Sequence, residues 1–133
     1  MRQSIKPVRI LFHAGDTVTF RLEGIAPGRA GKAVVRTNLG RAEVRRRELV
    51  DFAEHNRPPV GLDWHDIELH PAPDGSRSIT LPLTQMGVFE AKCCFIPDGG
   101  APIEWAEGGN FRFKVESAAA EDKYQNEWFI WQD

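Results

Sequence analysis

The stretch "ITLPLTQMGVFEAKCCFIPDGGAPIEWAEGGNFRFKV", Ile79 to Val115, decides the fold of this chain. Apolar and polar residues alternate along three of its segments, which are separated by a glycine break and a glycine-rich turn. Alternation with a period of two places the apolar side chains on one face of a β-sheet. The inward-facing sets are Ile79, Leu81 and Leu83, then Phe89, Ala91, Cys93 and Phe95, and finally Phe111, Phe113 and Val115. A second sheet can cover such a face, and it brings no catalytic machinery with it.

Segments upstream repeat this β pattern. They are the short apolar run Val8 to Phe12, the alternating "TVTFRL" at 17–22, the β-rich "KAVVRT" at 32–37, and Ile67 and Leu69 around Glu68. Turns rich in Gly, Pro, Asn and Asp separate these runs. We therefore predict an all-β fold, an immunoglobulin-like antiparallel two-sheet β-sandwich of about seven strands. A small open barrel is the alternative.

One segment interrupts the β pattern. Residues 43–55, "EVRRRELVDFAEH", lack Gly and Pro and carry charged pairs at i,i+4 spacing, which predicts one short helix across an end of the sandwich. Consecutive residues spread around a helix, so the run Arg45-Arg46-Arg47 does not make one patch. We interpret this run as solvated helix surface, with an anion or partner contact as the alternative.

Length and composition bound the domain organisation. The chain has 133 residues, with 41% hydrophobic and 27% charged residues, as expected of a soluble globular domain. We assign residues 1–117 to the β-sandwich domain and residues 118–133 to an aromatic-rich C-terminal tail, or a linker toward a following domain. The tail aromatics Tyr124, Trp128, Phe129 and Trp131 are expected to form a partner or domain interface.

Charge and cysteine content limit the partners and the compartment. The net charge is −2 and the pI is near 6.1, so we expect no nucleic-acid partner and no membrane partner. The N-terminus lacks the features of a signal peptide, and no run approaches the ~20 apolar residues of a membrane span. Cys93 and Cys94 are adjacent, so in a strand they face opposite ways and do not form an ordinary disulfide. Two such thiols are typical of a reducing cytoplasm.

No residue pattern in the chain predicts a catalytic, metal or cofactor site. The four histidines lack the spacing of zinc ligands, and the carboxylates are scattered among turns. The glycine-rich segments have no strand-to-helix context for a phosphate loop, and we interpret them as hairpin turns.

Trp64 and Trp105 are the candidate ligand-binding residues. Both lie at predicted strand ends beside loops. An exposed indole in such a place can stack on the flat apolar face of a sugar ring or anchor a protein interface. The alternative is that the two rings cap the ends of the sandwich core.

The order of the motifs resembles the N-terminal domain of glycogen debranching enzymes over roughly Gly15 to Val115. The matching positions are Phe20-Arg21-Leu22, Gly31-Lys32-Ala33-Val34 with Thr37-Asn38, and Gly87-Val88-Phe89. The resemblance implies a β-sandwich that precedes an amylase-like barrel with 4-α-glucanotransferase activity, and an amylo-α-1,6-glucosidase module in the full enzyme. The catalytic carboxylates of that family belong to the later domains, and no position here matches them.

Three hypotheses follow for the function. The first is a non-catalytic module in glycogen metabolism that positions a catalytic domain of the same or a partner chain and contacts α-glucan through Trp105 and Trp64. The second is a stand-alone immunoglobulin-like interaction module that docks a partner through the tail aromatics. The third is a small hydrolase that uses His65 or His70 with Asp63 or Asp66.

Overall fold

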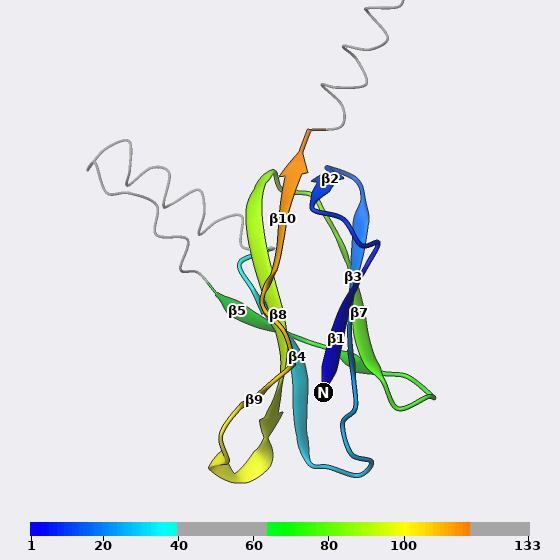
Figure 1. Ribbon diagram of the computed structural model, residues 1–133, viewed down its shortest axis with the longest axis vertical. Coiled ribbons are helices and arrows are strands. Elements are labelled where there is room, and N and C mark those ends of the chain that lie inside the picture. The colour runs from blue at the N-terminus through cyan, green and yellow to red at the C-terminus, as the bar shows by residue number, and fades with distance from the viewer. Residues whose placement is uncertain (40–63, 118–133) are drawn as a thin grey trace, which may run out of the picture.

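The computed structural model describes residues 1–39 and 64–117, which form two β-sheets packed face to face (Figure 1). Sheet A has the strand order β1 (Arg2–Lys6), β3 (Thr17–Glu23), β7 (Arg77–Pro82), β6 (His70–Pro71). Sheet B has the order β2 (Leu11–His13), β10 (Phe111–Glu116), β8 (Gly87–Pro97), β4 (Gly31–Thr37), β5 (His65–Glu68), and β9 (Glu104–Trp105) also pairs with β8. The prediction of an all-β sandwich is confirmed.

The strand order is that of an immunoglobulin-type sandwich. The first, second, fifth and fourth strands of such a domain share one sheet, and the last two strands lie beside the third in the other. Sheet A follows the first pattern, and the run β10-β8-β4-β5 in sheet B follows the second. The N-terminal segment changes sheets, because β1 pairs antiparallel with β3 while β2 pairs parallel with β10.

The alternating residues of the sequence form the core between the sheets. Val18, Phe20 and Leu22 of β3 are fully buried, and so are Phe89, Ala91, Cys93 and Phe95 of β8. The ring of Phe113 in β10 packs against Phe12, Phe20 and Phe89 at centroid distances of 5.5, 6.3 and 5.9 Å. Because Phe20 belongs to sheet A and the other three to sheet B, these aromatic contacts join the two layers.

The end of β4 is closed by two polar side chains that extend its pairing with β8. Thr37 donates its hydroxyl proton to the Glu90 carbonyl oxygen at 2.6 Å, and Asn38 Oδ1 accepts the Glu90 N–H at 3.0 Å. Both residues are buried, so the two bonds satisfy groups that would otherwise be costly to desolvate. The "TN" pair therefore belongs to the framework of sheet B.

Two parts of the sequence behave differently from expectation. In the apolar run Val8 to Phe12, only Phe12 is buried, whereas Val8 and Ile10 are 88% and 81% exposed. Strand β1 was not anticipated, because its polar residues alternate with only one large apolar side chain, Ile5.

Other expectations fall outside the part of the chain that the structure describes. Neither the helix expected at residues 43–55 nor the tail at residues 118–133 belongs to the described residues. Within residues 1–39 and 64–117 the single helical element is the 3-10 turn η1 (Asp98–Gly100), and no helix is long and apolar enough to cross a membrane.

Candidate functional site

Trp105 lies on the outer face of sheet B, where β9 pairs with β8. Its partner in the register is Cys94, whose side chain points away from the core that holds Cys93. The Arg36 guanidinium carbon lies 5.3 Å from the indole centroid, and Lys92 Nζ lies 5.8 Å from it. Both distances are in the range of cation–π attraction, which holds the ring in place. The ring is still 45% exposed, so Trp105 does not cap an end of the core.

A row of charged side chains crosses sheet B beside Trp105. Asp66 of β5, Arg36 of β4 and Lys92 of β8 are register partners, so their side chains share the outer face. Arg36 donates two hydrogen bonds to the Asp66 carboxylate, at 2.7 and 3.0 Å, and the bond to Asp66 raises the pKa of Arg36. A bidentate pair of this kind fixes the plane of the guanidinium.

The structure brings the two candidate tryptophans together. Trp64, which immediately precedes β5, lines one hollow with Trp105. The hollow has a volume of about 210 Å³, and its remaining lining residues are Arg36, Lys92 and Asn110. Two indoles with two cations and an amide combine apolar surface with hydrogen-bond donors. This combination suits a ligand that has flat apolar faces and many hydroxyl groups.

A bulge between β9 and β10 carries the chain from Trp105 to Asn110. Here the Cys93 N–H donates to Gln3 Oε1 at 2.8 Å, and Gln3 Nε2 donates to the Gly109 carbonyl at 2.9 Å. The Ala106 N–H donates to the Cys93 carbonyl at 3.1 Å. Gln3 belongs to sheet A, so its amide ties the edge of that sheet to the bulge beside the hollow. Nothing in the sequence around Gln3 indicated this role.

A second anchor holds the hairpin between β8 and β9. Arg29, in the loop between β3 and β4, donates two hydrogen bonds to the Glu104 carboxylate, one of them at 2.8 Å. Its guanidinium carbon also lies 4.8 Å from the Phe95 ring centroid. The hydrogen bond from Arg29 lowers the pKa of Glu104 and raises that of Arg29. Trp105 is thereby anchored through the residue before it, Glu104, and through the residue after it, Ala106.

Of the residues of the hydrolase hypothesis that the structure describes, the two histidines lie in different sheets. His65 lies in β5 of sheet B, His70 lies in β6 of sheet A, and Asp66 is engaged by Arg36. Asp63 lies outside the described residues. Among the residues that the structure describes, no group of three His, Cys, Asp or Glu side chains is placed to hold a metal ion.

The predicted interface residues of the tail, Tyr124, Trp128, Phe129 and Trp131, also lie outside the described residues. The fold and the hollow define the described part as an immunoglobulin-type β-sandwich with a tryptophan-lined outer face. Comparison of the sequence with protein-family models and with curated proteins finds no match.

Proposed function

We propose that this chain is a non-catalytic β-sandwich module of a glycogen-debranching-type protein, and that it contacts α-glucan through Trp64 and Trp105. In this proposal the module also positions a catalytic domain of the same or a partner chain in the cytoplasm. The motif order in the sequence supports the family, and the buried free thiols of Cys93 and Cys94 are in keeping with the compartment.

A single observation carries the sugar-binding part of the proposal: two tryptophans far apart in the sequence line the same hollow. The apolar face of a glucose unit can cover an indole ring, while its hydroxyl groups accept hydrogen bonds from cationic and amide side chains. Arg36, Lys92 and Asn110 supply such donors at the same place. Because the Arg36 guanidinium and the bulge are each held by several contacts, little side-chain ordering is required on binding.

The test is binding of the full chain to maltooligosaccharides, measured by tryptophan fluorescence and by retention in glycogen-containing native gels. We expect Trp105→Ala and Trp64→Ala each to weaken binding at least about tenfold, a loss of roughly 1.4 kcal/mol. Trp105→Phe should keep much of the affinity, because a ring remains to stack.

Val88→Ala serves as the matched control, since Val88 is 61% exposed on β8 but does not line the hollow. Absence of retention and of any fluorescence change in the unaltered chain would remove glucan binding and leave only the positioning role. Equal binding of cello-oligosaccharides would show a carbohydrate site without α-glucan preference.

A second candidate function is a stand-alone interaction module of immunoglobulin-like type. The observation that favours it is the pair of exposed apolar side chains, Val8 and Ile10, beside the edge of sheet B. Size-exclusion chromatography of the chain with and without residues 123–133 distinguishes the two candidates. A monomer in both cases counts against docking of a partner copy through the tail.

A further inference from the structure

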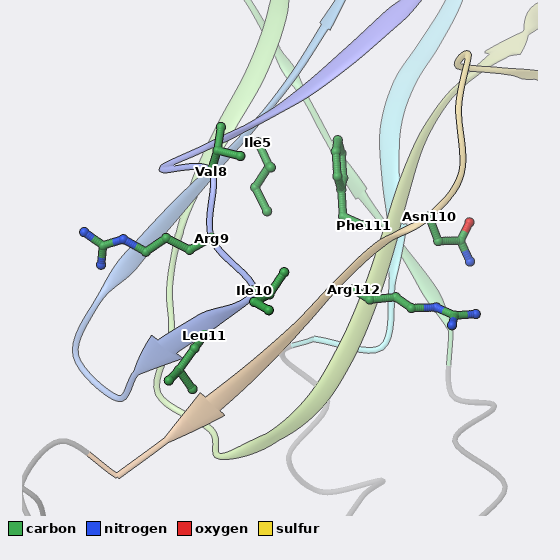
Figure 2. Close-up of a pocket in the computed structure, with 8 residues that line it drawn as sticks. All are labelled: Ile5, Val8, Arg9, Ile10, Leu11, Asn110, Phe111 and Arg112. Carbon is green, nitrogen blue, oxygen red and sulfur yellow. The ribbon is translucent and has the colours of Figure 1, made fainter.

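A groove of about 670 Å³ runs along the open side of the sandwich, between the edge strand of sheet A and the edge of sheet B (Figure 2). Its apolar lining comes from β1, the connection to β2, β2 itself and β10: Ile5, Val8, Ile10, Leu11 and Phe111. Figure 2 shows the side chains of Ile5, Ile10 and Phe111 around one hollow.

The backbone that forms the groove is held by hydrogen bonding, and several of its apolar side chains are exposed. The Lys114 N–H donates to the Ile10 carbonyl at 2.9 Å, which fixes the connection against β10. Ile5 and Phe111 pack against the core from beneath, while Val8, Ile10 and Leu11 are 88, 81 and 42% exposed. Exposed apolar side chains that gather at one place mark a surface that another segment covers.

The charge at the groove is positive. Among the residues that the structure describes, its ionic lining residues are Arg9 and Arg112, and none of the lining residues is acidic. In Figure 2 these two side chains extend to opposite sides of the apolar hollow. Arg112 forms an ion pair with Glu90, whereas Arg9 has no ion-pair partner among the described residues. An occupant that suits this groove combines large apolar side chains with flanking carboxylates.

We propose that the C-terminal segment of this same chain, residues 118–133, occupies the groove. Trp128, Phe129, Ile130 and Trp131 form its apolar run, and the acidic residues Glu121, Asp122, Glu127 and Asp133 surround that run with Lys123 as the single basic residue. The segment thus has apolar side chains that match the apolar lining of the groove and acidic side chains that complement its two arginines.

The connection to the sandwich allows this placement. The segment follows Ser117, and β10, which ends at Glu116, contributes Phe111 and Arg112 to the groove. The far end of the groove lies roughly 20 Å back along the extended strand from Glu116. The chain from Ser117 to Trp128 spans up to about 35 Å when extended, so Trp128 reaches the whole groove after a turn.

The test uses the full chain with Trp64→Phe and Trp105→Phe, so that Trp128 and Trp131 are the sole tryptophans. We expect their emission to be blue-shifted relative to the unfolded chain, and to move to the red in Val8→Asp, which places a carboxylate in the groove. Arg9→Glu should give a red shift that added salt diminishes. Both positions are outside the core, so the sandwich still folds.

Val88→Asp is the matched control, because it places the same carboxylate on an exposed position of β8 that does not line the groove. Tryptic cleavage after Lys123 should be severalfold faster in Val8→Asp than in Val88→Asp. Solvent-like emission before any groove substitution, or an equal red shift in both variants, overturns the proposal. A blue shift that is lost on dilution also overturns it, because the occupant is then a second copy of the chain.

Discussion

Cys93 and Cys94 are neighbours in β8, yet their thiols lie in different surroundings. Cys93 is part of the core between the sheets, whereas Cys94 is buried on the outer face opposite Trp105. Burial raises the pKa of Cys93 from its ordinary 9.0 to about 12. Burial also raises the pKa of Cys94, although the positive charge of Arg36 opposes the shift. Both thiols stay protonated, and therefore weakly nucleophilic, at neutral pH.

The raised pKa of Cys93 makes the free energy of unfolding depend on pH in the alkaline range. Between pH 9 and 12 the unfolded chain releases the thiol proton while the folded chain keeps it, so folding loses stability as the pH rises, by about 1.4 kcal/mol per unit. Urea unfolding at pH 8 and pH 10 should show a larger loss for the unaltered chain than for Cys93→Ala. Equal losses in the two chains would contradict this coupling, whatever the absolute stability of the variant.

At the scale of the element, β8 organises sheet B. It pairs with β4 and β10 along its two edges and extends into the hairpin that carries Trp105. Where β4 begins, Gly31 lies opposite Pro97 of β8, with a φ of 152°. A Cβ atom at Gly31 would lie 2.5 Å from the Ile96 carbonyl oxygen and 2.6 Å from the Phe95 ring. The close approach of these two strands therefore requires glycine.

We expect Gly31→Ala to lower the free energy of unfolding by about 3 kcal/mol or more, because backbone strain and a clash with rigid atoms add. Gly15→Ala is the matched control. Gly15 also has a positive φ, 102°, but a Cβ there meets nothing within 4 Å, so the expected cost is about 1–2 kcal/mol. Denaturant unfolding measures the cost of each substitution. Equal costs would show that the atoms around Gly31 shift to accommodate a Cβ without a further decrease in the free energy of unfolding.

At the scale of the whole molecule, aromatic rings are among the buried side chains that join the two sheets. Phe20 of β3 is fully buried and meets Phe111 and Phe113 of β10 at centroid distances of 6.0 and 6.3 Å. We expect Phe20→Ala to cost about 3–5 kcal/mol, because it leaves a cavity where the layers meet. Phe20→Leu should cost much less.

The same variant tests whether the sandwich unfolds as one unit. In Phe20→Ala, the amide signals of β7 in sheet A and of β4 in sheet B should still disappear at a single denaturant concentration, as in a two-state transition. Loss of the sheet A signals first, with sheet B intact, would show that the two layers are separately stable.

The sequence predicted the layers well because their signal is local. Alternation alone placed Phe20, Phe89 and Phe113 in the core, and it placed Cys93 and Cys94 on opposite faces. Strand β1 was missed, since an edge strand with mostly polar residues has almost no apolar alternation to detect.

The candidate site could be predicted only in part. Trp64 and Trp105 were recognised singly, as aromatic residues beside loops. Their meeting in one hollow depends on the register of β4 with β5 and of β8 with β9, which no short pattern encodes. The salt bridge between Arg36 and Asp66 likewise depends on that register. It engages Asp66, one of the two carboxylates that the hydrolase hypothesis names.

The bond between Gln3 and the Cys93 amide has a consequence for how motion is read out in this fold. That amide proton sits in the middle of sheet B, yet its acceptor belongs to the edge strand of sheet A. Its exchange with solvent deuterium therefore records the detachment of β1, while neighbouring amides bonded within the β4–β8 ladder record the opening of sheet B itself. The exchange rate of this one backbone proton thus reports how often β1 leaves sheet B beside the tryptophan hollow.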